Sequence, residues 1–172
     1  SGPIRGRPYG GVTTLIKSDL ARYVVTIATS ERYVILRLCD TILLNLYLPC
    51  VGTTNRLLIG EDILCELDSY LENLTNVNII VGGDLNIDLS TADASAVLVR
   101  NFMCRHNLKR CDELVGKSNQ FTYVNESLGH RSCIDYLLVS DASKLIDYCV
   151  IEPEINLSDH LPIMAEHLVK IP

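Results

Sequence analysis

One short stretch constrains the fold more than any other part of this sequence: residues 79–86, which read IIVGGDLN. Its apolar, β-branched first half is typical of a buried strand, and the two glycines allow the backbone to turn where that strand ends. Asp84 and Asn86 follow at the carboxyl end, where layered α/β proteins usually bind their ligands. In extended chain their side chains share one face. The stretch therefore predicts a small polar site, although a simple turn explains Asp and Asn equally well.

Size and charge narrow the class of protein. The 172 residues are 48% hydrophobic and 21% charged, which indicates a soluble globular chain, and we expect residues 1–172 to form a single domain. The formal net charge of −6 argues against a protein that binds nucleic acids through a general excess of Lys and Arg. It does not exclude an enzyme, because a bound Mg²⁺ offsets clustered carboxylates.

The sequence lacks three features of secreted or membrane proteins, and this indicates where the protein is located. The seven cysteines are odd in number, widely spread and without a Cys-x-x-Cys pair, which favours reduced thiols in an intracellular protein over a disulfide framework or a zinc site. No apolar run has the length of a membrane span, and the amino-terminal residues do not resemble a signal peptide. We therefore expect no membrane partner.

Hydrophobic periodicity predicts an α/β chain that begins with antiparallel strands. The expected strands are 10–17, 23–29, 33–39, 41–48, 79–83, 121–123, 133–139, 145–151 and 161–168. The expected helices are 55–74 and a second one that begins at the N-cap candidates Ser90 and Thr91 and ends near Asn107. The tight connection at Asp40 predicts a hairpin.

Further residues suited to phosphoryl chemistry lie at or near strand ends. Asp135 interrupts an apolar strand and needs a cationic or hydrogen-bonding partner, because an unpaired buried carboxylate is costly. Asp159 and His160 stand in a loop before the last strand. Tyr47 follows Asn45 on the polar face of its strand.

Four segments resemble, in the correct order, the successive motifs of the endonuclease/exonuclease/phosphatase superfamily. They are NLYLP (45–49), GDLN (83–86), IDY (134–136) and SDHLPI (158–163). RPYGGV (7–12) and RSCIDY (131–136) look most like the apurinic-type endonuclease domain of LINE (non-LTR) retrotransposons. The resemblance implies a two-sheet α/β sandwich of the DNase I-like type that hydrolyses phosphoesters with Mg²⁺ or Mn²⁺.

The resemblance also implies roles for single residues. Asp84 would act as the base for the attacking water, and Asn86 would steady a phosphate oxygen or that water. His160, kept cationic by Asp135, would neutralise charge that develops on the phosphoryl oxygens. Tyr47 would donate a hydrogen bond to the phosphate.

The same resemblance implies binding residues and partners. Asp159 would hold the metal together with Asp84, and Thr122, Arg131 and Ser132 would line a groove for nucleic acid. DNA is the expected substrate. The expected parent is a larger polyprotein that contains a reverse transcriptase, and the expected location is nuclear.

In one respect the sequence departs from the family pattern. Two earlier strands of the family carry an Asn and a metal-binding Glu, ahead of the segment matched here by 7–12, and this sequence does not contain them. We therefore expect a fold truncated at its amino-terminal end, corresponding to two-thirds or more of the family domain. Metal binding should be weakened, because Mg²⁺ commonly needs one or two carboxylates.

Other functions stay open at this stage. A scaffold with the same fold and no catalysis would bind nucleic acid or protein, and a phosphatase would act on a small phosphoester. Two further ideas fail. An EF-hand loop starting at Asp84 would have Leu89 where Gly is required. The adjacent residues Ser158, Asp159 and His160 cannot form the relay of a hydrolase triad.

Overall fold

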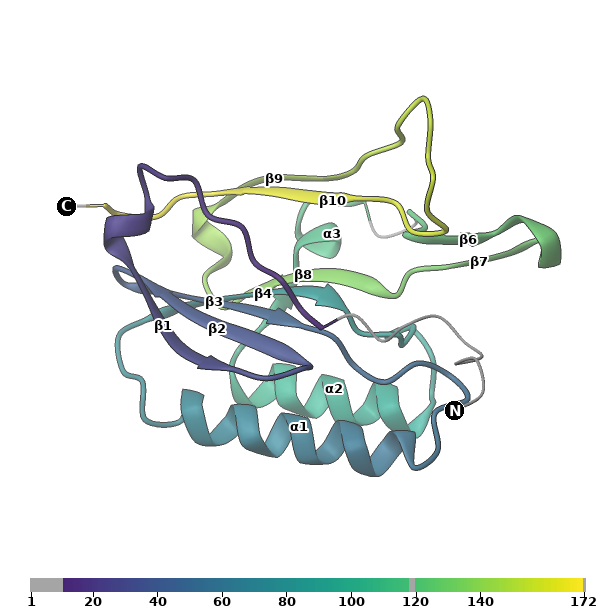
Figure 1. Cartoon of the computed structure of the whole chain (residues 1–172), viewed down its shortest axis with the longest axis horizontal. Helices are drawn as coiled ribbons and strands as arrows, with labels where there is room; N and C mark the ends of the chain where they lie inside the picture. The colour runs from purple at the N-terminus through teal and green to yellow at the C-terminus, as the bar shows by residue number, and fades with distance from the viewer. Residues whose placement is uncertain (1–10, 118–119, 172) are drawn as a thin grey trace, which may run out of the picture.

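The main sheet has six strands in the order β1-β2-β3-β4-β8-β5 (Figure 1). This computed structural model describes residues 11–117 and 120–171. The strands are β1 (Val24–Thr29), β2 (Tyr33–Leu38), β3 (Thr41–Leu46), β4 (Asn78–Asp84), β5 (Lys109–Arg110) and β8 (Asp135–Val139). β3 and β4 run parallel, and the other neighbouring pairs run antiparallel. The predicted hairpin at Asp40 joins β2 to β3.

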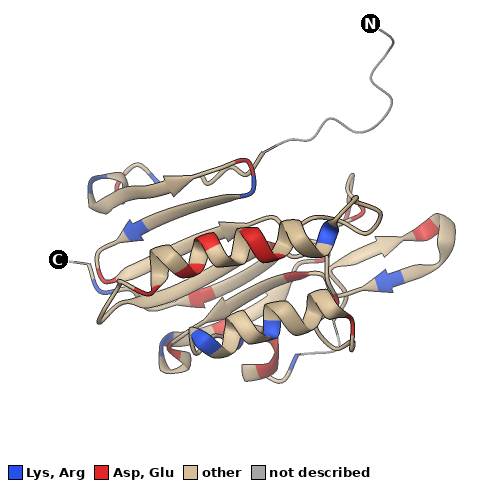
Figure 2. Ribbon diagram, turned by 90° about the horizontal axis from the view of Figure 1, so that it is seen from below, with Lys and Arg blue, Asp and Glu red and all other residues tan. Residues whose placement is uncertain are grey.

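Two long helices, α1 (Arg56–Leu71) and α2 (Ala94–Arg105), cover one face of this sheet (Figure 1). Leu64 and Leu67 of α1 and Phe102 of α2 are fully buried against the sheet, as the helical spacing of apolar residues predicts. The outer face of α1 is acidic and carries Glu61 and Asp62 (Figure 2). In the part of the chain that is described, no helix is long and apolar enough to cross a lipid bilayer.

The opposite face of the sheet is covered by a smaller antiparallel pair, β9 (Leu145–Val150) and β10 (Ile163–His167) (Figure 1). Together with the short helix α3 (Cys111–Leu114) this pair encloses a second core around Cys111, Val139 and Tyr148. The hairpin formed by β6 (Tyr123–Asn125) and β7 (His130–Ser132) projects from one end of the molecule. Three single-turn helices complete the list: η1 (Ala21–Tyr23), η2 (Glu126–Leu128) and η3 (Ala142–Lys144).

The alternation in β3 is confirmed. Leu44, Leu46 and Leu48 are buried, whereas Asn45 and Tyr47 are partly exposed. The strand expected over 10–17 is wrong for its described part, 11–17, which forms no sheet ladder. The Asn45 side chain holds this segment instead, with a 3.1 Å hydrogen bond from Nδ2 to the carbonyl of Thr13. Residues 7–10 of the LINE-like segment lie outside the described residues.

Two element boundaries also differ from the prediction. The second helix begins at Ala94 with Asp93 as its N-cap, not at Ser90 and Thr91. The carboxylate of Asp88 accepts hydrogen bonds from the backbone N–H and the hydroxyl of Ser90, at 2.9 and 2.6 Å, and so forms a local turn. The short strand expected over 121–123 lies at Tyr123–Asn125.

A close approach between β3 and β4 requires glycine at position 83. Gly83 has a φ of 146°, and a Cβ built there would lie 2.0 Å from the carbonyl oxygen of Leu46. The backbone N–H of Leu48 donates to the carbonyl of Asp84 at 3.0 Å, so the segment that follows β3 stays bound to the end of β4. The predicted turn at the end of the central strand is thus built on contact between two backbones.

We expect Gly83→Ala to lower the free energy of unfolding by at least about 3 kcal/mol, because a methyl group there collides with backbone that cannot move aside. Gly52 is the matched control, since its φ is 92° but a Cβ there meets nothing within 4 Å. Gly52→Ala should therefore cost only about 1 kcal/mol. Urea unfolding of both variants measures the difference, and equal losses would contradict the argument.

Candidate active site

The register of the sheet places two carboxylates side by side. β4 and β8 pair so that Asp84 lies directly opposite Asp135. Like charges in cross-strand positions repel each other. Burial and, to a smaller extent, the charge of Asp135 raise the pKa of Asp84 to about 6 from its ordinary value of 3.8. Asp84 can thus exchange a proton close to neutral pH, as a general base must.

His160 supplies the partner that Asp135 needs. Its Nδ1 lies 3.0 and 3.2 Å from the two carboxylate oxygens of Asp135. This hydrogen bond raises the pKa of His160, with a smaller contribution from the charge of Asp135, and so favours the imidazolium form. The ring of Tyr123 packs edge-on against the imidazole with 5.1 Å between ring centroids.

Asp84, Asp135 and His160 each offer a ligand atom within 4.8 Å of the other two. Their side chains fit a divalent cation, because two neighbouring carboxylates with costly negative charge are what hard cations such as Mg²⁺ bind. Asp135 and His160 also line a cavity of about 620 Å³ between the two sheets. Its polar lining includes Asn45 and Ser158, and apolar side chains from β3, β4, β8 and β10 make up most of the rest.

The β6–β7 hairpin holds the pieces of this cluster in place. Thr122 is fully buried, and its hydroxyl accepts 3.0 Å hydrogen bonds from the backbone N–H groups of both Ile134 and Asp135. Its carbonyl accepts from the N–H of Leu161 at 2.7 Å. The expectation that Thr122 lines a nucleic-acid groove is therefore corrected: its side chain points into the protein and fixes the segment that carries Asp135.

Asn86 and Tyr47 lie outside the three-residue cluster, and only Asn86 has a hydrogen bond to Asp84. The backbone N–H of Asn86 donates to Asp84 Oδ1 at 2.8 Å, and its side-chain amide donates to the carbonyl of Leu48 at 2.9 Å. Tyr47 is partly exposed, with the guanidinium carbon of Arg32 5.1 Å from its ring centroid. Asn86 is thus bound to the Asp84 carboxylate, and Tyr47 has the guanidinium of Arg32 over its ring.

The remaining predicted residues are spread over the hairpin and the last loop. Arg131 is exposed on β7, with its guanidinium carbon 5.5 Å from the ring centroid of Phe121. Ser132 is partly buried and pairs through its carbonyl with the N–H of Thr122. Asp159 accepts a 2.8 Å hydrogen bond at its carbonyl from Val124, but it does not belong to the group of three possible metal ligands.

Sequence reasoning missed three residues at the site. Tyr123 packs on His160, Asn45 lines the cavity, and the side chain of Asn156 donates to the carbonyl of His160 at 3.1 Å. The position of Asn45 on the polar face of β3 was a usable signal. Nothing in the local pattern pointed to Tyr123, because its contact with His160 joins distant parts of the chain, and the local hydrogen bond of Asn156 had no sequence signal of its own.

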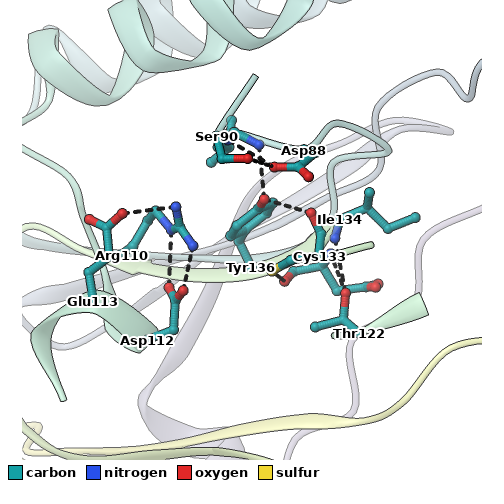
Figure 3. A network of polar contacts seen from close by, with 11 residues as sticks. Asp88, Ser90, Arg110, Asp112, Glu113, Thr122, Cys133, Ile134 and Tyr136 are labelled. Atoms are coloured by element: carbon teal, nitrogen blue, oxygen red, sulfur yellow. Dashed lines mark hydrogen bonds and ion pairs between the residues drawn. The ribbon is translucent and has the colours of Figure 1, made fainter. Parts of the chain in front are cut away.

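Tyr136 joins two segments of the chain through its hydroxyl (Figure 3). It is buried in β8 next to Asp135, and its hydroxyl donates to the carbonyl of Cys133 at 2.7 Å. The same hydroxyl accepts from the backbone N–H of Leu89 at 3.0 Å. One phenol therefore joins the start of β8 to the loop that follows β4.

Comparison with solved structures defines the class of fold. The chain is similar to a 3′-5′ exonuclease (NExo) from Neisseria meningitidis, with a TM-score of 0.63 and 18% identity over 79% of this chain and 64% of that one. It is also similar to an AP endonuclease from Archaeoglobus fulgidus, with a TM-score of 0.62 and 16% identity over 81% of this chain and 66% of that one. The predicted DNase I-like α/β fold is confirmed.

The family follows from the sequence. The model of the Endonuclease/Exonuclease/phosphatase family matches residues 2–160, and the chain belongs to this family. A third similar structure is the 3′ phosphatase NExo from Neisseria bound to product DNA hairpin, with a TM-score of 0.63 and 19% identity over 85% of this chain and 70% of that one. The chain thus spans about two-thirds of the length of these proteins. A comparison with curated proteins gives no match.

We expect Asp84→Asn to stabilise the metal-free protein at pH 7.5 by about 1–3 kcal/mol. The pKa of Asp84 rises to about 6 on folding, so its ionised form destabilises the fold above that pH, and the gain should disappear as the pH falls toward 4. Thermal unfolding at both pH values measures the effect. Asp62→Asn, the same change on an exposed helix position, is the control. A lower melting temperature for Asp84→Asn at pH 7.5 would contradict the assignment.

We expect Tyr136→Phe to lower the free energy of unfolding by about 1–3 kcal/mol, because it leaves the N–H of Leu89 and the carbonyl of Cys133 without their partner. Tyr148 is also buried, but its hydroxyl makes no hydrogen bond among the described residues. Tyr148→Phe should therefore change stability by less than about 0.5 kcal/mol. Chemical denaturation compares the two, and a larger loss for Tyr148→Phe would refute the role given to the phenol.

Proposed function

We propose that this chain is the downstream part of a metal-dependent phosphodiesterase that cleaves DNA as an endonuclease. The observation that carries the proposal is the cluster of Asp84, Asp135 and His160, in which a carboxylate with a pKa of about 6 lies beside an Asp–His pair. Family membership gives independent support. These groups supply a base and a cation at one place, which is what hydrolysis of a phosphodiester requires.

The roles follow from the chemistry of each group. Asp84 accepts the proton of the attacking water, and Asn86 donates to Asp84 Oδ1 and orients it. His160, held as imidazolium by Asp135, stabilises negative charge on the phosphoryl oxygens. Tyr47 is the proposed donor to the phosphate.

A metal ion completes the proposed site. Asp84 and Asp135 would hold Mg²⁺ or Mn²⁺, and Asp159 of the neighbouring loop stays our prediction for a further ligand. Such an ion, when bound, supplies a Lewis acid that polarises the phosphoryl oxygen. The position of Asp84 directly opposite Asp135 supports this assignment, because two adjacent carboxylates repel each other and a cation between them would offset that repulsion.

DNA is the proposed substrate, and it would approach over the hairpin rather than over the helices. α1 presents acidic residues such as Glu61 and Asp62, which repel phosphates (Figure 2). The hairpin presents Arg131 beside the exposed ring of Phe121, a pairing suited to phosphate and base contacts. Arg131 and Ser132 are our proposed residues of the nucleic-acid groove.

The finer assignment is a LINE-type endonuclease within a polyprotein that also contains a reverse transcriptase and acts in the nucleus. It rests on the RPYGGV and RSCIDY segments. We also propose that the complete domain has further strands with the family's Asn and metal-binding Glu. The apolar walls of the 620 Å³ cavity and the edge position of β10 in its two-stranded sheet support that view, since in the described residues β10 pairs with β9 alone.

Two other functions have specific support. A phosphatase acting on a small phosphoester is favoured by the likeness to a protein described as a 3′ phosphatase. A scaffold without catalysis is favoured by the small set of candidate ligands, because Mg²⁺ takes six oxygen ligands and the cluster found among the described residues has only two carboxylates and a histidine. The Asp–His pair disfavours the scaffold, since a binding protein has no need of an imidazolium beside a base.

We expect the protein to nick supercoiled plasmid DNA in Mg²⁺ or Mn²⁺, and His160→Ala to lower the rate by about a hundredfold or more, because an interaction with developing charge is lost. His106→Ala is the matched control: it also removes an imidazole from an Asp–His pair, 2.6 Å from Asp68, but away from the cluster. It should keep the nicking rate. Gel analysis at saturating DNA measures both.

Two results would contradict this function. The absence of nicking together with the absence of Mn²⁺ binding near Asp84, measured by paramagnetic broadening in NMR spectra, would favour the scaffold. Release of phosphate from a 3′-phosphorylated oligonucleotide without any nicking would favour the phosphatase.

A further inference from the structure

One arginine binds both loops that carry the backbone of the candidate site. Arg56, the first residue of α1, donates from Nε to the carbonyl of Pro49 at 3.0 Å and from Nη2 to the carbonyl of Asn86 at 2.6 Å. Pro49 belongs to the loop after β3 and Asn86 to the loop after β4. The side chain of Arg56 is 20% exposed, and its Nη1 lies 3.9 Å from Asp93. Its guanidinium is thus engaged on two sides by backbone.

The two loops are also bound to each other at Asp84. Leu48 donates its backbone N–H to the carbonyl of Asp84 and accepts at its own carbonyl from the side chain of Asn86. The N–H of Asn86 donates to Asp84 Oδ1. A displacement of Asn86 would therefore reach the Asp84 carboxylate directly, through one hydrogen bond.

Asn86 has a backbone conformation that outside contacts can stabilise. Its φ is 52°, in the left-handed region, which is unfavourable for most residues with a Cβ and is adopted more readily by Asn. A charged hydrogen bond to its carbonyl is stronger than a neutral one, so Arg56 can hold the conformation. An ammonium group has neither the planar fork nor the reach to bind both carbonyls in this way.

We propose that Arg56 is a positioning residue: it holds Asn86 in its left-handed conformation, and Asn86 in turn fixes the orientation of the Asp84 carboxylate. The consequence for catalysis rests on the function proposed above, whereas the effect on Asn86 does not. The polar contacts of Arg56 among the described residues are with Pro49, Asn86 and Asp93, and none is with the Asp–His pair. The influence of Arg56 should thus appear in the rate of the chemical step more than in substrate affinity.

The test compares Arg56→Ala and Arg56→Lys with Arg100→Ala. Arg100 is the matched control because its Nη1 also binds two carbonyls, of Leu89 at 2.7 Å and of Thr91 at 2.8 Å, in the later part of the loop after β4, where these two residues make no hydrogen bond with Asp84. The lysine variant keeps the charge, so it separates geometry from electrostatics if the alanine variant does not fold. Backbone amide exchange, followed by NMR in the metal-free protein, reports on Asn86 without any need for activity.

We expect exchange of the Asn86 amide to accelerate about tenfold or more in both Arg56 variants and to stay unchanged in Arg100→Ala. The kcat for DNA nicking should fall about tenfold to a hundredfold with KM nearly constant, because a misplaced base slows the chemical step. Both results together would support the proposal.

Failure of each part can be told apart. Unchanged Asn86 exchange in Arg56→Lys would overturn the proposal whatever the activity. Faster exchange with a normal kcat would overturn the claim that Arg56 acts through Asp84. If exchange is faster in the Arg56 variants but the wild-type protein cleaves no DNA, the role of Arg56 in holding Asn86 would be supported and the proposed function would be refuted.

Discussion

The repulsion between Asp84 and Asp135 is the constraint on which the site depends. The sheet fixes these acids as cross-strand neighbours, so neither can move away without breaking the ladder between β4 and β8. Such a pair is destabilising unless a positive charge lies close to it. His160, whose pKa is raised by its hydrogen bond to Asp135, supplies such a charge when protonated, and a divalent cation would supply a second one. The fold thus stores an electrostatic cost at the place where a cation and a phosphate would relieve it.

Near the two acids, the backbone segments of β3 and β4 approach each other unusually closely. Gly83 lets the end of β4 approach the carbonyl of Leu46, and beyond it the loops after β3 and β4 continue side by side. This approach explains why one arginine can reach both loops. It also explains why the site forms at the end of the central strand, since there two loops begin within hydrogen-bond distance of each other. The geometry of the site therefore depends on the absence of a side chain at Gly83.

Local signals in the sequence were sufficient for part of this arrangement. The alternation of Leu and polar residues in β3 gave the buried face correctly, and an acid inside the apolar strand β8 correctly implied a charged partner, which the structure identifies as His160. Contacts between residues far apart in the sequence could not be predicted from local patterns. Thr122 was expected at the surface, but its hydroxyl serves two N–H groups of a segment that is adjacent only in the folded chain. The predicted helix start was wrong because Ser90 donates hydrogen bonds to the Asp88 carboxylate and does not cap the helix. Propensity alone does not show which of these interactions forms.

The β6–β7 hairpin differs from the rest of the molecule in how it is held. None of its strand residues is fully buried, and its links to the last loop are backbone hydrogen bonds and the contact between Tyr123 and His160. Segments with little buried apolar surface open locally at a free energy below that of global unfolding. On warming, the imidazole would therefore lose its carboxylate partner while the layer formed by the helices and the large sheet is still intact. Loss of the Asp–His pair would then precede melting, and cooling would restore the geometry without refolding the chain.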